Sequence, residues 1–233
     1  IAIGDIHGMA EKLDQLLLEI DVWRSAHHPG APCRLIFLRD YVDRGPDARG
    51  VLERMRALEQ DGAICLRGNH EALMISAPES DLGMQTFVLN GGNETIRSLR
   101  TLDAFVEAVA WMASLPLSFD DERLFFVHAG IRPGVPLPKQ REKDLLWIRK
   151  PFLTHPGPFP TYVVHGHSPT LRLPGHSRRP QVFSHRCNLD TGAVFGGPLS
   201  AAVFTDEQTT PIAILTTEGC VPISSDNPGK GQT

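Results

Sequence analysis

The sequence has no run of about 20 apolar residues, so it offers no membrane-spanning helix of ordinary length. It also has no excess of Lys and Arg, and its net charge of -4 argues against a nucleic acid or a membrane surface as its partner. The basic and then apolar pattern of a secretory leader is missing from its first residues. We therefore expect a cytoplasmic protein with neither a nucleic-acid nor a membrane partner.

Cysteine is scarce, and no two cysteines form a Cys-x-x-Cys pair. This spacing favours buried thiols in a reducing compartment, with a disulfide or a zinc site as the alternative. The four residues are Cys33, Cys65, Cys187 and Cys220.

What the sequence does contain is the composition of a soluble globular domain, with 41% hydrophobic and 21% charged residues. A chain of 233 residues buries enough surface to hold one large α/β core without disulfides or a partner. We predict a single domain over residues 1–217 and a flexible polar tail over 218–233. The oligomeric state is left open.

Short apolar runs alternate with helical patterns in the first half of the sequence. Apolar residues recur at the spacing of one helix face at 13–20 and again at 51–58. Strands are predicted around these helices at 1–3, 34–39 and 63–66. Three β-α repeats of this kind favour a sheet with helices packed on it.

The second half is predicted to be mainly β. Before it, a mostly helical pattern covers 71–115 and is expected to form a cap beside the sheet, with breaks at Pro78 and Gly91-Gly92. The segments 131–160 and 168–186 are rich in Pro, Gly and Arg and are predicted to be loops. The remaining apolar runs predict strands at 123–128, 162–165, 187–194, 199–204 and 212–215.

Residues that can bind metal ions stand at the ends of five predicted strands, which is where α/β folds place their sites. Each cluster alone is ordinary, because Asp-x-His arises by chance and Asn is a common helix cap. Their repetition at successive strand ends indicates one shared site. The clusters are Gly4-Asp5-Ile6-His7-Gly8, Asp40-Tyr41-Val42-Asp43-Arg44-Gly45, Gly68-Asn69-His70-Glu71, His128-Ala129-Gly130 and His165-Gly166-His167.

The chemical types of these groups point to a class of metal ion. Mixed carboxylate, imidazole and amide ligands suit Mn, Fe, Zn or Co rather than Ca or a thiolate-bound ion. Six such groups are too many for one four-coordinate zinc ion, and they suit two ions that share a carboxylate.

The order of the motifs resembles the phosphoprotein phosphatase family of calcineurin-like metallophosphoesterases over about residues 1–205. Asn90-Gly91-Gly92 and Leu145-Leu146-Trp147-Ile148-Arg149 are similar to its small bacterial members. The resemblance implies an α/β fold, a β-sandwich of mixed sheets flanked by helices, with a mostly helical insertion at about 71–115. It also implies two divalent metal ions, with Mn expected first and Fe, Zn or Co as alternatives.

The resemblance also implies a role for each matching residue. One ion would take Asp5 and His7, the other would take Asn69, His128 and His167, and Asp40 would bridge them. A water or hydroxide between the ions would attack the phosphorus. His70 would be the general acid, held by Asp43, and the phosphate would be bound by Arg44, Arg149 and Asn69. His165 is expected to be a supporting residue, and surface or loop positions are expected for His27, His28, His155, His176 and His185.

The function implied first is a serine/threonine protein phosphatase that acts on a phosphorylated protein or a small phosphoester. The alternative enzyme is a symmetrical dinucleoside tetraphosphatase, whose members resemble this family but typically lack the residue that matches Asp43 and carry Asp where this chain has Glu71. These two residues therefore favour the phosphatase.

An alternative of another class is a binding protein that keeps the fold without catalysis. Its one support is Arg39, because the family normally has Gly before the bridging Asp. Because strand residues alternate sides, Arg39 is predicted to point to the opposite face of the sheet if Asp40 points at the metal ions. A buried guanidinium there would have to reach solvent or find a carboxylate.

Overall fold

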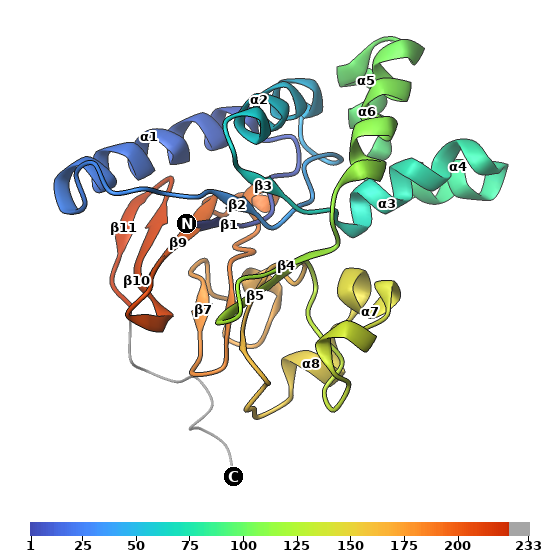
Figure 1. Cartoon of the computed structure of the whole chain (residues 1–233). Coiled ribbons are helices and arrows are strands. Elements are labelled where there is room, and N and C mark those ends of the chain that lie inside the picture. The colour runs from blue at the N-terminus through green and yellow to red at the C-terminus, as the bar shows by residue number, and fades with distance from the viewer. Residues whose placement is uncertain (224–233) are drawn as a thin grey trace.

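The computed structural model of the protein describes residues 1–223, and the part of the predicted tail at 224–233 lies outside the described residues. Two β-sheets lie face to face, and helices cover both outer faces (Figure 1). This arrangement confirms the predicted β-sandwich of mixed sheets flanked by helices.

The first sheet has six strands in the order β11-β10-β9-β1-β2-β3. Strands β1, β2 and β3 run parallel, whereas β9, β10 and β11 are joined to them by antiparallel pairing. Ala2 lies between Ile36 and Ala202 in the register, so the C-terminal strands pair directly with the first strand. The bounds are Ala2–Ile3 (β1), Ile36–Phe37 (β2), Ile64–Cys65 (β3), Ser200–Thr205 (β9), Gln208–Thr216 (β10) and Gly219–Val221 (β11).

The second sheet has five strands in the order β4-β5-β6-β8-β7. Its three central strands, β5, β6 and β8, are parallel, and β4 and β7 flank them in antiparallel pairing. Each sheet therefore contains a set of three parallel strands. The bounds are Ser118–Asp120 (β4), Leu124–Val127 (β5), Tyr162–His165 (β6), Gln181–Val182 (β7) and Arg186–Asn188 (β8).

Eight α-helices lie among the described residues. Helices α1 and α2 cover the first sheet, α7 and α8 lie beside the second, and α3 to α6 form the predicted helical insertion, which projects from one end of the sandwich (Figure 1). None of the helices in residues 1–223 combines the length and the apolar character needed to cross a bilayer. The bounds are Ala10–His27 (α1), Ala48–Gln60 (α2), Asn69–Ser76 (α3), Asp81–Phe87 (α4), Asn93–Leu99 (α5), Leu102–Ser114 (α6), Glu142–Trp147 (α7) and Lys150–Leu153 (α8).

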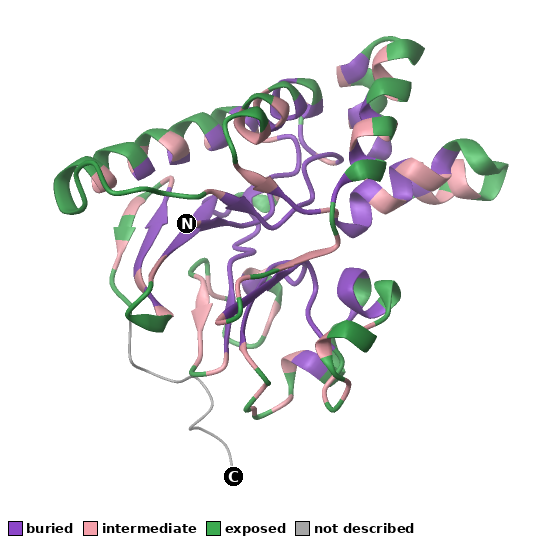
Figure 2. Cartoon of the chain, in the orientation of Figure 1, coloured by how far each residue is buried: buried purple, intermediate pink, exposed green. Residues whose placement is uncertain are grey.

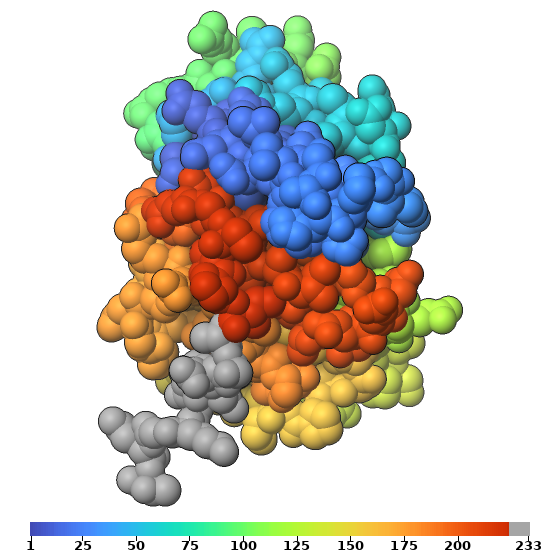
Figure 3. Space-filling view, turned by 90° about the vertical axis from the view of Figure 1, so that its left-hand side faces the viewer, coloured from blue at the N-terminus to red at the C-terminus, as the bar shows by residue number. Residues whose placement is uncertain are grey.

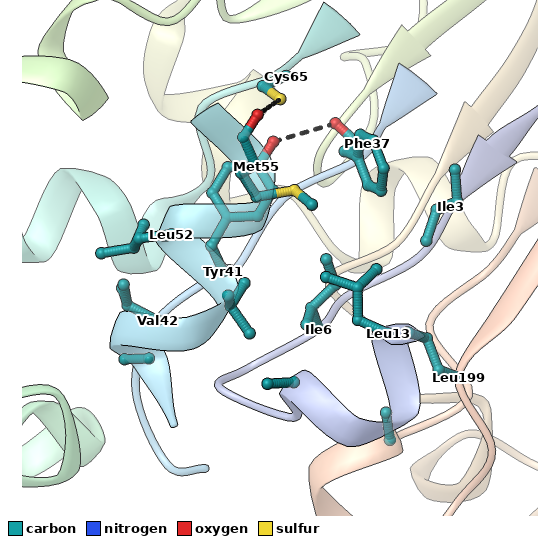
Figure 4. Close-up of a cluster of buried hydrophobic side chains, with 14 of the residues drawn as sticks. Ile3, Ile6, Leu13, Phe37, Tyr41, Val42, Leu52, Met55, Cys65 and Leu199 are labelled. Carbon is teal, nitrogen blue, oxygen red and sulfur yellow. Dashed lines mark hydrogen bonds between the residues drawn. The ribbon is translucent and has the colours of Figure 1, made fainter. Parts of the chain in front are cut away.

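Apolar side chains fill three layers: helices against the first sheet, sheet against sheet, and the second sheet against its helices. In the first layer Leu13 of α1 and Met55 of α2 pack with Phe37 of β2 (Figure 4). Ile36 and Leu38, its neighbours in the chain, belong to the layer between the sheets, as strand alternation requires. Figure 2 shows buried strands between helices whose outer faces are exposed. Burial of each large apolar side chain contributes about 1.5–3 kcal/mol to the stability of the fold.

The first helix is fixed to segments from the other end of the described chain. Figure 3 shows α1 (blue) lying against the C-terminal strands (red). Gln15 Nε2 donates to the carbonyl of Thr217 at 2.7 Å, and Lys12 Nζ donates to the carbonyls of Ala193 and Gly197 at 2.8 and 2.6 Å. These bonds hold the segment after β8 against the N-terminal half of the sandwich.

Two of the predicted strands are too long. The strand predicted at 34–39 is formed only at Ile36–Phe37, and the strand predicted at 187–194 ends at Asn188. The early end of the second of these strands has a local cause. Asp190 Oδ1 accepts a hydrogen bond from the backbone N–H of Gly192, which has a φ of 74°. Such a side-chain turn replaces strand pairing.

Three other predictions need correction. The segment predicted as a loop at 131–160 contains α7 and α8, and the tail predicted from 218 begins with a strand, since β11 pairs with β10 across a two-residue turn. Pairing with β10 satisfies backbone groups that a frayed tail would leave to water. Of the four thiols, all free, only Cys65 and Cys187 are buried, whereas Cys33 and Cys220 are exposed.

Arg39 stands just beyond β2, with a φ of 108° and its side chain fully buried. The alternation argument does not apply to it, because β2 ends at Phe37 and the backbone turns left-handed at Arg39 and Asp40. Among the described residues its guanidinium has no hydrogen-bond partner. Burial lowers the pKa of Arg39 to about 9, against the opposing attraction of Tyr41 and Glu71. A left-handed backbone at this position explains why glycine suits it.

We expect Arg39→Gly and Arg39→Met both to raise the melting temperature. The Gly variant relieves a strained backbone, worth about 1–3 kcal/mol. Both variants remove an unpaired buried charge, and this removal should outweigh the lost packing, because such a charge costs several kcal/mol. Calorimetry should detect the gain, since 1 kcal/mol moves the Tm of a chain this long by about 2–4 °C.

Arg100→Gly is the matched control for this experiment, because Arg100 also has a positive φ, 66°, but is exposed. The melting temperature of Arg100→Gly should rise less than that of Arg39→Gly, because this variant relieves only backbone strain. Equal gains for Arg39→Gly and Arg100→Gly would eliminate the charge from the explanation. A lower Tm for both Arg39 variants would mean that the buried guanidinium stabilises the fold.

Candidate metal centre

The predicted ligand groups gather where the parallel strands of both sheets end. The first sheet places Asp5 after β1, Asp40 after β2 and Asn69 after β3. The second sheet places His128 after β5 and His167 after β6. The carboxyl ends of parallel strands are where α/β folds hold ligands, and here two such ends meet.

Backbone bonds between the strand-end loops hold these groups in place. The N–H of His7 donates to the carbonyl of Asp40 at 2.6 Å, and the N–H of Gly166 donates to the carbonyl of His128 at 2.8 Å. The N–H of His167 donates to Asp5 Oδ2 at 2.9 Å and so joins the two sheets. A Cβ at Gly166 would collide with Asp5 Oδ1, so only glycine allows this approach.

The backbone around the site is strained. Nine non-glycine residues have a positive φ in the described part of the chain, and six of them belong to the strand-end loops. Left-handed backbone at such residues costs energy and persists only where the surrounding contacts impose it, often at functional sites. The six are His7, Arg39, Asp40, Asp43, Arg44 and His167.

One group of ligand atoms is formed by Asp40, His128 and His167, all buried. Asn69 completes it, since its Oδ1 lies 2.6 Å from His128 Nε2 and 3.0 Å from His167 Nδ1. The two imidazole nitrogens are 3.0 Å apart, and His128 Nε2 is 3.5 Å from Asp40 Oδ2. Atoms bound to one divalent ion at about 2.1 Å have separations of about 3 Å, so these residues fit such an ion.

A second group consists of His7, Asp40 and His70, also buried. His7 Nε2 lies 3.5 Å from Asp40 Oδ2, and its Nδ1 is fixed by the carbonyl of Val42 at 2.9 Å. Asp40 therefore belongs to both groups. A carboxylate in this position suits two ions that share it.

Asp5 stands outside both groups, beside His167 and Asp190. Its Oδ1 is buried and has no hydrogen-bond partner among the described residues. Asp190 is buried too and lines a cavity beside the ligand groups, and sequence reasoning missed it by including it in a strand. The rule that candidate ligands follow the ends of parallel strands could have found it. Asp190 follows β8, which is the third parallel strand of the second sheet.

The electrostatics of the cluster favour a bound cation. Burial raises the pKa of Asp40 well above its usual range, and repulsion from Glu71 adds to the shift. Burial likewise raises the pKa of Asp5, with repulsion from Asp190 and Asp40. Burial lowers the pKa of His7, His128 and His167 well below the usual value. Neutral imidazoles and carboxylates that gain from a nearby positive charge are what a divalent ion requires.

His70 and Asp43 form a buried pair beside these groups. His70 Nδ1 lies 2.6 Å from Asp43 Oδ2, and the Thr95 hydroxyl donates to Asp43 Oδ1 at 2.7 Å. The carboxylate thus holds the imidazole with Nδ1 facing Asp43, and Nε2 is the nitrogen left for other partners. Burial raises the pKa of Asp43 to about 7 and lowers that of His70.

The Glu71 side chain binds backbone groups of the strand-end loops. Its carboxylate accepts hydrogen bonds from the backbone N–H groups of Gly68, Tyr41 and Asp40 at 2.8, 2.8 and 3.3 Å. It therefore joins the loop after β3 to the loop after β2. An acidic residue at this position serves the backbone, so the choice of Glu does not by itself identify a substrate.

The cavity beside the ligand groups has a volume of about 160 Å³, and both predicted arginines line it. Arg44 Nη1 is 2.8 Å from His7 Nε2, and the exposed Arg149 donates to Ser168 Oγ at 3.5 Å. His165 belongs to neither ligand group and lies with its Nε2 3.2 Å from Arg186 Nη1. The lining residues that the sequence analysis did not assign to the site include Trp147, Arg172 and Phe195.

A family profile described as calcineurin-like phosphoesterase matches residues 1–197. A protein of Halalkalibacterium halodurans named asymmetrical bis(5'-nucleosyl)-tetraphosphatase PrpE is 29% identical over 228 residues, which cover 87% of this chain and 88% of the relative. A protein of Janthinobacterium sp. named symmetrical bis(5'-nucleosyl)-tetraphosphatase is 33% identical over 132 residues, 57% of this chain and 43% of the relative.

Solved structures share the fold. One assigned provisionally to a diadenosine tetraphosphatase has a TM-score of 0.62 at 23% identity and covers 92% of this chain and 90% of its own. A metallophosphoesterase from Sphaerobacter thermophilus has a TM-score of 0.54 at 17% identity, over 96% and 88%. These relatives are named as tetraphosphatases and a metallophosphoesterase, so they support the wider family inferred from the motifs rather than its protein phosphatase branch. Because the profile covers the loops that carry Asp5, Asp40 and His167, this chain belongs to the calcineurin-like phosphoesterases, a family of metal-dependent enzymes.

Proposed function

We propose that the protein hydrolyses bis(5'-nucleosyl) oligophosphates. The observation that carries the substrate class is the likeness to relatives named for this activity, which extends over 87% of this chain in the asymmetrical tetraphosphatase of Halalkalibacterium halodurans. The cavity supports the reaction class, because it combines candidate metal ligands with arginines that suit phosphate oxygens.

The ligand assignment is part of the proposal. Asp5 and His7 would hold one divalent ion, and Asn69, His128 and His167 would hold the other. Asp40 would serve both, as its place in the two groups of ligand atoms suggests. When bound, the ions would activate a water molecule and neutralise phosphate oxygens. Manganese is the ion we propose first, with Fe, Zn or Co also suited to this ligand set.

The protein's own groups would position the substrate and supply a proton. Arg44 and Arg149 are far apart in the sequence but line one cavity, and they would hold the phosphate under attack. His70 would protonate the leaving oxygen, and Asp43 would keep its ring oriented through the 2.6 Å bond.

The protein phosphatase first implied by the motifs remains a testable alternative. Its support was Asp43 and Glu71, and Glu71 is engaged with backbone N–H groups instead of the cavity. Asp43 is hydrogen-bonded to His70, and this contact involves no group that would recognise a protein substrate. The support from these two residues is therefore weaker than the support from relatives named as tetraphosphatases.

The substrate class can be tested with the Mn-loaded protein. We expect kcat/KM for a dinucleoside tetraphosphate to exceed that for a phosphoserine peptide by at least about tenfold, since one additional charge-assisted contact supplies that much. Chromatography of the nucleotides distinguishes a nucleoside triphosphate plus monophosphate from two diphosphates, and thus asymmetrical from symmetrical cleavage. A preference for the peptide would overturn the proposal.

Metal content gives a second test. We expect two Mn²⁺ per chain by elemental analysis after saturation, and loss of activity with a chelator. Asp40→Asn should weaken binding of both ions, because Asp40 lies in both groups, whereas His128→Asn should weaken one. His176→Asn, at an exposed residue, is the control. A single ion per saturated wild-type chain would contradict the assignment.

The His70–Asp43 pair gives a third test. His70→Asn should lower kcat by roughly 10²–10⁴-fold for an alkyl phosphate, the usual range for a lost general acid. The loss should be much smaller for 4-nitrophenyl phosphate and for a phosphoanhydride, because their leaving groups need little protonation. Asp43→Asn should act through the same unit, so that the double variant is little worse than either single one. Equal losses on all substrates would exclude His70 as the acid.

A further inference from the structure

Three arginines line the candidate cavity, and none of them forms an ion pair with a carboxylate in residues 1–223. They are Arg44, Arg149 and Arg172. Arg44 and Arg149 follow the motifs, but Arg172 does not, and the reaction as proposed leaves it without a role. Unpaired guanidinium groups around one cavity suit an anion with several negative charges.

The cavity is too small for a whole dinucleotide. Its volume of about 160 Å³ lies below the range of roughly 300–1,000 Å³ typical of sites that enclose a small molecule. One phosphate fits among the ligand groups, whereas further phosphates of an oligophosphate chain must extend towards the rim. Arg172 and Phe195 are partly exposed lining residues, so they stand where such phosphates would pass.

Arg172 is held in place by an aromatic ring. Its guanidinium carbon lies 3.9 Å from the centre of the Phe195 ring, and that of Arg44 lies 5.5 Å from the same ring. Phe195 thus contacts a guanidinium of the inner site and one of the rim. A stacked guanidinium keeps its N–H groups directed outward in its own plane, available to phosphate oxygens.

The two short turns that carry this pair are packed tightly together. Arg172 ends the turn Thr170–Arg172 and Phe195 ends the turn Ala193–Phe195. The N–H of Thr170 donates to the carbonyl of Asp190 at 2.8 Å, and a Cβ at Gly192 would collide with the Leu171 side chain. The rim is therefore built into the fold, on the segment that α1 also holds through Lys12.

We propose that Arg172, positioned by Phe195, is a subsite for the second phosphate of an oligophosphate chain. The proposal rests on the proposed function and adds the residue that would distinguish an oligophosphate from a single phosphoryl group. Arg44 and Arg149 contact the phosphate under attack in either case, but only an oligophosphate reaches Arg172. Phe195 acts as a positioning residue.

The kinetic test compares two substrates of the Mn-loaded enzyme. Arg172→Gln should lower kcat/KM for a dinucleoside tetraphosphate by about tenfold, the effect of one charge-assisted contact, and leave 4-nitrophenyl phosphate unchanged. Phe195→Leu should reproduce part of this loss, and Phe195→Tyr, which keeps the ring, should not. The matched control is Arg179→Gln, an exposed arginine that does not line the cavity. Equal effects of Arg172→Gln on both substrates, or none, would overturn the proposal.

A binding test decides the question without turnover. With free Mn²⁺ held constant, calorimetry should show that Arg172→Gln weakens the binding of inorganic tripolyphosphate by about tenfold. The binding of orthophosphate should hardly change. Unchanged tripolyphosphate binding would refute the subsite. If the wild-type protein prefers phosphopeptides, the proposed function fails, and tripolyphosphate binding still reports on Arg172 separately.

Discussion

The protein buries five carboxyl groups where the carboxyl ends of its two sheets meet: Asp5, Asp40, Asp43, Glu71 and Asp190. Glu71 accepts hydrogen bonds from three backbone N–H groups, whereas Asp5 and Asp40 each accept one, from His167 and His70. Burial raises the pKa values of Asp5 and Asp40, and repulsion from neighbouring carboxylates adds to both shifts. A divalent cation held by these groups would resolve this conflict, since it would supply the opposite charge. Much of the surrounding structure serves to keep these groups close.

The backbone shares that task. Loops from β1, β2 and β6 turn left-handed at the residues whose side chains face the site, and bonds such as His7 N–H to the Asp40 carbonyl hold the turns. The bond from the His167 N–H to Asp5 joins loops of the two sheets, so it depends on how the sheets pack together. Arg39 is the local exception, a buried charge at a position whose backbone suits glycine.

Reaction class and substrate class depend on different parts of the site. In the proposed reaction, the loops that carry the candidate metal ligands and the His70–Asp43 pair would act on one phosphoryl group, and that chemistry is common to esters and anhydrides. Discrimination must come from residues beyond this group, on the rim where Trp147 and Phe195 are partly exposed. The motif residues could therefore indicate a phosphoesterase while pointing to a protein substrate that the relatives do not support.

Local sequence determined the reaction class and most of the fold. Apolar periodicity located α1, α2 and the parallel strands, and ligand-type residues at strand ends identified Asp40, His128 and His167, because both signals lie within a few neighbouring residues. Only the tertiary structure decided that Asp40 belongs to two ligand groups, that Asp190 joins the cluster, and that Arg172 stacks on Phe195. Each of these depends on packing between segments distant in the chain, and such contacts leave no local periodicity to read.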